Sequence, residues 1–165
     1  MPDYPGVPVL LSPAERAFID TGGSPTVIAR NTTTADYQLY EFESVPYLGF
    51  PGSHDVYGDG SLVVVPAPGH TPGSIVAFMT LPNARRFAFL GDLAWRREGI
   101  TEREERPWFA STAMAIDHDP AGVRGNLLRI SAVAQQVSRN DSGAGARCAR
   151  IRRIAKSPLR RRGRF

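Results

Sequence analysis

The sequence predicts a mixed α/β domain followed by a basic C-terminal tail. Three observations support this prediction: short apolar strands separated by turn residues, an amphipathic helix that follows them, and an abrupt change of charge near residue 138. A chain of 165 residues is the usual size of one domain.

Charge divides the chain into two segments. Residues 1–137 contain 10 Arg and 15 Asp or Glu, a net charge of −5. Residues 138–165 contain nine Arg, one Lys and one Asp, a net charge of +9. We therefore expect an acidic folded body over 1–137 and an Arg-rich, disordered tail over 138–165.

Several classes of protein are disfavoured by composition. No stretch approaches the roughly 18 apolar residues that a transmembrane helix needs. The N-terminus lacks the basic start and apolar run of a signal peptide. Cys148 is the only cysteine, so an internal disulfide framework is excluded. We expect a cytoplasmic protein that does not bind membranes.

The sequence of the N-terminal part of the body predicts one helix. Val7–Leu11 is a short apolar run. The residues after it, Ser12-Pro13-Ala14-Glu15, fit a capping box with proline at the first helical position. The helix should reach about Asp20 and end at Gly22-Gly23. Residues 24–36 give no clear pattern.

Three apolar strands follow a turn at residues 57–61. They cover Leu62–Val65, Ser74–Thr80 and Phe87–Leu90. Because these strands are continuously apolar rather than alternating, we expect helices to cover at least one face of their sheet. Asp119-Pro120 should then begin a helix, and its apolar face recurs at Val123, Leu127, Ile130, Ala134 and Val137 before the pattern stops near Ser138.

His70 and Asp92 are the candidate metal ligands. His70 follows the first of the three strands, and Asp92 follows the third. If consecutive strands pair, both residues emerge at the same edge of the sheet. An imidazole and a carboxylate brought together suit a zinc-type site.

The sequence around these two residues resembles the metallo-β-lactamase superfamily. The resemblance rests on Asp59-Gly60-Ser61, on residues 66–74 (Pro-Ala-Pro-Gly-His-Thr-Pro-Gly-Ser) and on residues 89–93 (Phe-Leu-Gly-Asp-Leu). It implies that His70 ligates one of two divalent metal ions, zinc in the first instance, and that Asp92 bridges both. It also implies that residues 1–137 form part of a four-layer αββα sandwich, in a hydrolase of ester, lactone, thioester or similar bonds.

The rest of the family's metal site is missing from the sequence. Residues 1–69 do not contain the His-x-His-x-Asp-His motif. His54 has no histidine two positions away, and His118 precedes the amphipathic helix instead of following it as the last histidine ligand would. With two ligands left and no catalytic residue identified, we expect a fragment that binds metal weakly and is impaired in hydrolysis. An incomplete sandwich should also expose apolar surface and self-associate.

The basic tail leaves two alternatives open. As a real arm, it would make the chain a non-catalytic protein that binds nucleic acid or anionic partners by charge. Alternatively, its Ser-, Gly-, Ala- and Arg-rich composition is what a shifted reading frame in a GC-rich gene would encode. For the chain as a whole, a third interpretation is an inert remnant that neither hydrolyses substrates nor binds nucleic acid.

Other polar and aromatic residues have structural interpretations. We expect His54 to be a loop or outer-shell residue and His118 a polar residue at the helix entry. Asp55 and Asp59 should form turns. Trp95 and Trp108 should belong to the core or to a pocket wall.

Overall fold

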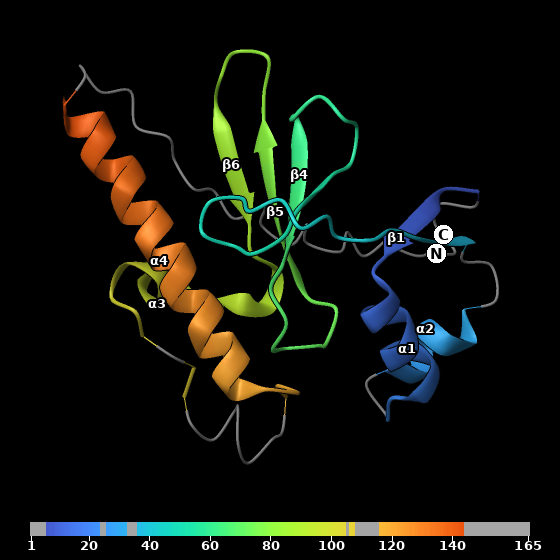
Figure 1. Cartoon of the computed structure of the whole chain (residues 1–165). Coiled ribbons are helices and arrows are strands. Elements are labelled where there is room, and N and C mark those ends of the chain that lie inside the picture. Colours follow the sequence, from blue (N-terminus) through green and yellow to red (C-terminus); the bar gives the residue numbers. More distant parts are fainter. Residues whose placement is uncertain (1–5, 24–25, 33–35, 105, 108–115, 144–165) are drawn as a thin grey trace, which may run out of the picture.

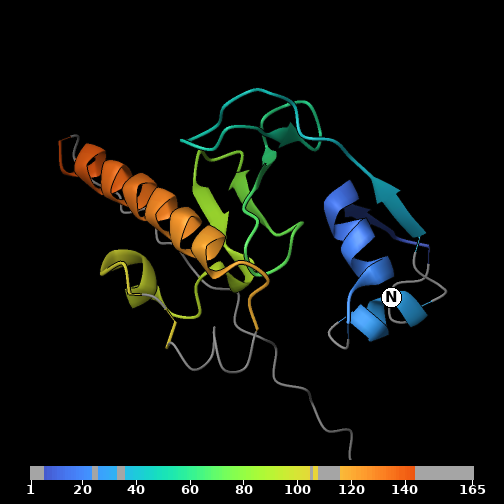
Figure 2. The same cartoon turned by 60° about the horizontal axis from the view of Figure 1, so that its bottom comes forward.

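The computed structural model describes residues 6–23, 26–32, 36–104, 106–107 and 116–143. The expectations for Trp108 and for most of the basic tail fall on residues outside these ranges. The described chain is a mixed α/β structure with a two-stranded and a four-stranded sheet, as Figure 1 shows. The four-stranded sheet lies between helix α4 on one side and an N-terminal unit on the other (Figures 1 and 2).

The N-terminal unit contains two parallel strands and two helices. Strand β1 (Pro8–Leu11) pairs with β2 (Asp36–Leu39), and the chain between them forms α1 (Pro13–Thr21) and the short α2 (Val27–Asn31). Helix α1 begins and ends as predicted: the Ser12 side chain caps its first turn and Gly22 follows its last residue. The parallel pairing and α2 were not predicted, because residues 24–36 carry no clear periodicity.

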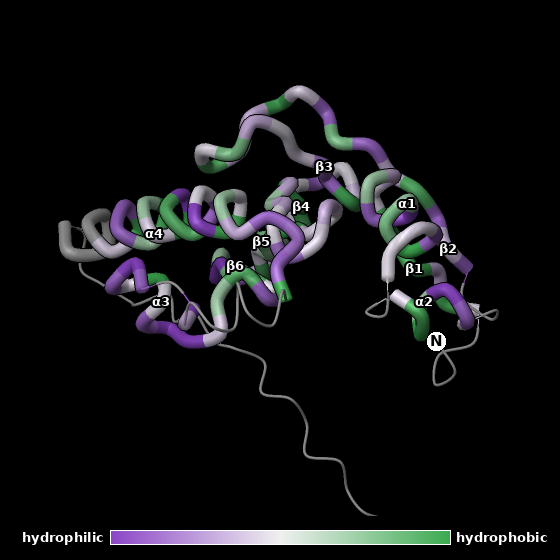
Figure 3. Tube along the Cα trace, turned by 90° about the horizontal axis from the view of Figure 1, so that it is seen from below, coloured by the Kyte–Doolittle hydropathy of each residue, from purple (hydrophilic) through white to green (hydrophobic). Residues whose placement is uncertain are grey.

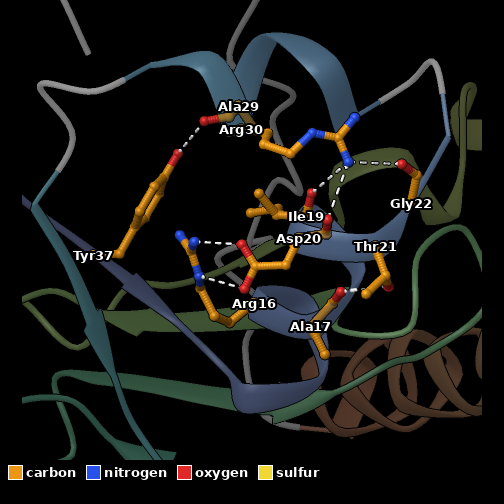
Figure 4. A network of polar contacts seen from close by, with 9 residues as sticks. All are labelled: Arg16, Ala17, Ile19, Asp20, Thr21, Gly22, Ala29, Arg30 and Tyr37. Carbon is orange, nitrogen blue, oxygen red and sulfur yellow. Dashed lines mark hydrogen bonds and ion pairs between the residues drawn. The ribbon is translucent and has the colours of Figure 1, made fainter.

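Polar side chains hold α1, α2 and β2 together, as Figure 4 shows. Arg30 in α2 donates from Nη1 to the carbonyl oxygens of Asp20 (3.1 Å) and Gly22 (3.0 Å) at the end of α1. The Tyr37 hydroxyl in β2 donates to the carbonyl of Ala29 (3.0 Å). A cation at a helix C-terminus satisfies carbonyls that have no partner within the helix.

The four-stranded sheet confirms the predicted strands and their order. It runs β3 (His54–Asp55), β4 (Leu62–Pro66), β5 (Ile75–Thr80) and β6 (Arg86–Phe89), with every neighbouring pair antiparallel. Turn formation by aspartate is also confirmed, because Asp55 accepts from the Gly60 amide (2.7 Å) and Asp59 from the Ser61 amide (2.8 Å). The Ser61 hydrogen bonds also lower the pKa of Asp59.

Helix α4 (Pro120–Gly143) covers one face of this sheet. Its Val123, Leu127 and Ile130 join a core with strand residues such as Val65 and Val76. Seen from below in Figure 3, hydrophobic and hydrophilic residues alternate along the helix. None of the described helices combines the length and the apolarity needed to cross a bilayer.

The end of α4 differs from the prediction. The helix continues to Gly143 instead of stopping near Ser138, so residues 138–143 belong to it rather than to a separate tail. Ser138 is accommodated because its hydroxyl donates to the carbonyl of Ala134 (2.9 Å), one turn back. Val137, predicted to face the core, is 42% exposed.

The opposite face of the sheet is apolar and only partly covered. Strand alternation places Leu62, Val64, Ile75, Ala77, Met79, Phe87 and Phe89 on this face, and all except Val64 are half-buried. At its β3 edge the Tyr40 ring stacks on His54 with centroids 4.7 Å apart. Burial, and secondarily the Glu15 carboxylate, raise the pKa of Tyr40.

Two short helical segments follow β6. A 3₁₀ turn, η2 (Gly91–Leu93), leads into α3 (Arg97–Thr101), and α3 packs beside α4. Leu93 and Ile100 from these segments join the same core as α4. The η2 turn, in which Asp92 lies, is therefore anchored to the main hydrophobic core through Leu93.

Candidate metal site at the sheet edge

The structure brings His70 and Asp92 together at one edge of the sheet. His70 lies on the loop between β4 and β5, and Asp92 lies in η2, three residues after β6 ends. His70 Nε2 is 3.7 Å from Asp92 Oδ2. Because β4 and β6 run in the same direction on either side of β5, their C-terminal ends emerge at the same edge.

The distance between these two atoms is compatible with a shared metal ion. Ligand atoms that each lie about 2.0–2.2 Å from one ion can be no more than about 4.4 Å apart. The observed 3.7 Å meets this condition. Within the described ranges, however, no group of three or more His, Cys, Asp or Glu side chains is placed to hold a metal ion. The pair therefore fits part of a coordination shell.

A buried carboxylate fixes the orientation of the His70 ring by contacting Nδ1, the ring nitrogen that does not face Asp92. Asp117 Oδ1 lies 3.0 Å from His70 Nδ1, and its side chain is only 1% exposed. Because a carboxylate accepts hydrogen bonds, it selects the tautomer with hydrogen on Nδ1 and leaves the Nε2 lone pair toward Asp92. The same Asp117 oxygen forms an ion pair with Arg106 Nη1. Asp117 is therefore shared by the histidine and a buried guanidinium.

The His70 loop is also held by the entry to α4. The amide of His118 donates to the His70 carbonyl (3.1 Å), and the amide of Asp119 donates to the Gly69 carbonyl (2.8 Å). Asn126, which is fully buried, donates from its side chain to the Pro68 carbonyl (2.8 Å). The backbone on both sides of the metal-ligand candidate is thus fixed to one helix.

Helix α1 holds the other end of the loop through Glu15. One carboxylate oxygen accepts from the Thr71 hydroxyl (2.6 Å) and from the Gly73 amide (3.0 Å). The capping-box prediction is therefore half correct: the Ser12 hydroxyl accepts from the Glu15 amide (3.3 Å), but the Glu15 carboxylate bonds the His70 loop. Gly73 permits this contact, since a Cβ there would lie 2.2 Å from the Glu15 Cβ.

Removing the Glu15 carboxylate should loosen the loop from α1. Glu15→Ala is expected to lower the free energy of unfolding by about 1–3 kcal/mol, because a charged acceptor is lost and the Gly73 amide loses its partner. Chemical denaturation would measure this. Asp20→Asn, which removes an exposed ion pair with Arg16 on the same helix, should cost under about 1 kcal/mol. Equal effects would contradict the assigned role of Glu15.

The other histidines and Trp95 have structural surroundings. His54 lies in β3 and pairs with Val64, so the expectation of a loop residue was wrong. His118 lies just ahead of α4 as predicted, with its ring edge-on to Phe18 at a centroid distance of 5.7 Å. Trp95 is 40% exposed and forms a pocket wall.

An open cavity of about 200 Å³ lies at the candidate site. His70 and Asp92 line it together with apolar side chains that include Ile75 and Leu90. Polar ligand atoms beside an apolar wall suit a small organic substrate. Glu15, Arg106 and Asp117, which support this site, were not identified from the sequence. Only Glu15 carried a local signal, and that signal indicated helix capping.

Comparison with known proteins identifies lactone hydrolases as similar. No protein-family model matches the chain. Over 63 residues it is 36% identical to the N-acyl homoserine lactonase AttM of Rhizobium radiobacter, a match that covers 38% of this chain and 24% of the lactonase. The chain thus spans about a quarter of that relative.

Solved structures of the same kind of enzyme share the fold. An N-acyl homoserine lactone hydrolase with the product N-hexanoyl-L-homoserine at its catalytic metal centre matches with a TM-score of 0.54 and 14% identity, over 79% of this chain and 43% of that one. A quorum-quenching N-acyl homoserine lactone hydrolase matches with a TM-score of 0.56 and 14% identity, over 81% of this chain and 46% of that one.

These matches agree with the resemblance carried by the sequence around His70 and Asp92. At 14% identity the structural matches establish the fold, while the local match to AttM adds sequence similarity. This chain spans less than half the length of each of these solved structures. In its described part, the chain is a mixed α/β protein that resembles a portion of the metallo-β-lactamase-type N-acyl homoserine lactonases.

Proposed function

We propose that this chain carries two ligands, His70 and Asp92, of a metal centre for lactone or ester hydrolysis, and that hydrolysis by the chain alone is weak. The observation that supports the proposal is the 3.7 Å separation of His70 Nε2 and Asp92 Oδ2 beside an apolar-walled cavity. The similar proteins are lactone hydrolases, which makes N-acyl homoserine lactones the first substrates to test.

Each side chain of the site has a distinct task in this proposal. His70 would offer Nε2 and Asp92 a carboxylate oxygen to a divalent ion, while Asp117 keeps the His70 ring in the required tautomer. A bound divalent ion supplies Lewis acidity and lowers the pKa of coordinated water. Two protein ligands are fewer than the three or four of a tight zinc site, so affinity and activity should both be low.

The direct test measures zinc binding by isothermal titration calorimetry. His70→Ala and Asp92→Ala should each weaken zinc binding by at least about 10- to 100-fold, the loss typical for removing even an outer-shell partner. His118→Ala is the matched control, since it removes a nearby histidine ring that contacts Phe18 and leaves both proposed donors in place.

Hydrolysis would be measured in parallel with N-hexanoyl homoserine lactone and an aryl ester, with added zinc and with chelator. Weak turnover that requires zinc and is lost in both ligand variants would support the proposal. Zinc binding unchanged by both ligand variants, or lost equally in the His118 control, would contradict it.

The alternative function rests on the charge of the C-terminal segment. Residues 144–165 of this segment contain eight Arg and one Lys and no acidic residue, a charge that favours binding to a polyanion such as DNA. Deleting residues 144–165 should abolish binding to random duplex DNA, and the affinity of the full chain should fall steeply with salt. Binding that survives the deletion, or does not depend on salt, would argue against a basic arm.

A further inference from the structure

The partly covered face of the four-stranded sheet carries a continuous apolar strip along β5, which lies between β4 and β6 (Figure 1). Ile75, Ala77 and Met79 are two positions apart on this strand, so they lie on the same face. We call these three residues the β5 strip, and each of them is half-buried. Apolar side chains of the neighbouring strands border it: Leu62 and Val64 on β4, and Phe87 and Phe89 on β6.

The β5 strip begins at the candidate metal site. Ile75 lines the cavity of about 200 Å³ that His70 and Asp92 also line, so the cavity wall and the strip share this side chain. Strand β5 starts at the edge of the sheet where both candidate ligands lie, and it runs away from that edge. The apolar wall of the cavity therefore continues from Ile75 onto the face of the sheet.

The shape of the β5 strip suits an extended hydrocarbon chain. Its two ends, Ile75 and Met79, are four positions apart, which is about 13 Å along a strand. At its middle the small Ala77 lies between the larger Val64 and Phe89 on the neighbouring strands. The flexible, unbranched side chain of methionine adapts to apolar partners of different shape. The strip thus offers a long, narrow apolar surface without a specific polar contact.

We infer that the β5 strip is the acyl-chain subsite of the candidate metal site, and that this site favours substrates with long acyl groups. The inference rests on the proposed function, because the lactone or ester group would bind beside His70 and Asp92. The acyl chain passes Ile75 and packs on Ala77 and Met79. Since only one side of it is covered, each added methylene should raise the affinity about twofold, half of the free-energy gain of full burial.

The test measures the binding of acyl compounds to the full chain without metal, in the presence of a chelator. The probes are N-butanoyl-, N-hexanoyl- and N-decanoyl-L-homoserine, which have no lactone ring to hydrolyse. Isothermal titration calorimetry should give an affinity about 10- to 20-fold higher for the decanoyl than for the hexanoyl compound, because the two differ by four methylenes.

Nuclear magnetic resonance of methionine methyl groups locates the bound acyl chain. The protein has three methionines, Met1, Met79 and Met114, and the signal lost in Met79→Gln assigns Met79. The decanoyl compound should shift the Met79 signal saturably, whereas the butanoyl compound is too short to reach it and should leave it unchanged.

Met79→Gln also tests the contribution of the far end of the β5 strip. It keeps the length of the side chain but makes its end polar, and it should lower decanoyl affinity about fourfold, the gain of two methylenes. Butanoyl binding should not change. Leu128→Gln is the matched control, since Leu128 is an exposed apolar residue on α4, outside the sheet, and this variant should bind both compounds normally.

The parent protein alone can overturn the inference, without any variant. An affinity that does not rise with acyl length, or a Met79 signal that the decanoyl compound leaves unchanged, would do so. A dimer in sedimentation that Met79→Gln converts to a monomer would also do so, because a second copy would then cover the strip. Zinc titration of His70→Ala and Asp92→Ala tests the metal site separately, so failure of the acyl subsite and failure of the proposed function are distinguishable.

Discussion

Asp117→Ala is expected to destabilise the fold by about 3–5 kcal/mol, because it leaves a buried arginine without its counter-charge. The Asp117 side chain is 1% exposed and that of Arg106 5%, so water cannot replace the lost carboxylate. The loss is a large part of the roughly 5–15 kcal/mol that holds a typical domain folded. Chemical denaturation monitored by circular dichroism would measure it.

The double variant Arg106→Met with Asp117→Leu separates the charge effect from packing. Replacing both partners of a buried ion pair with apolar side chains is often neutral or stabilising. The double variant should therefore recover much of the stability lost by Asp117→Ala. If the single variant costs less than about 1 kcal/mol, the pair behaves as a solvent-exposed contact and its assigned role is wrong.

Gly69→Ala is the second change with a large expected effect. Gly69 has a φ of +153°, and a Cβ there would lie 2.5 Å from the Val123 amide nitrogen and 2.7 Å from the Val123 Cγ2. Relief would require moving the His70 loop away from the first turn of α4. Backbone strain and overpacking together should cost about 2–4 kcal/mol, which thermal or chemical unfolding would detect.

Gly125→Ala is the matched control for that substitution. Gly125 lies one turn further along α4, and a Cβ there would meet nothing within 4 Å. Since alanine favours helix over glycine, this variant should be more stable than the parent by about 0.5–1 kcal/mol. Opposite signs for the two glycines are the expected result. Equal, small effects would show that the loop is not packed tightly against α4.

The sequence predicted those features that depend on neighbouring residues. Ser12 and Pro13 determine the start of α1, and Asp55 and Asp59 determine the turn before β4. The three apolar strands are short and separated by turns, so consecutive antiparallel pairing was the simplest arrangement and is the one observed. That pairing alone places His70 and Asp92 at one edge.

The supporting contacts of the site could not be predicted in this way. His70 and Asp117 are 47 positions apart, and no local pattern links them. Glu15 has a valid local role as a helix-capping residue, but in the folded chain the Thr71 hydroxyl and Gly73 amide occupy its carboxylate. The helix-capping preference of Glu15 is overridden because tertiary packing brings other hydrogen-bond donors within reach of its carboxylate.

Because these contacts are long-range, we expect the His70 loop to take its final conformation late in folding. Its partners lie 47 to 58 positions away in sequence: Asp117 and Asn126 on one side and Glu15 on the other. Bringing such distant residues together carries a loop-closure entropy that local hairpins avoid, and contacts of high sequence separation slow folding. The β4–β5 hairpin can therefore form early with a mobile loop. We expect the orientation of the His70 ring to become defined only once the segment that enters α4, with Asp117, has docked.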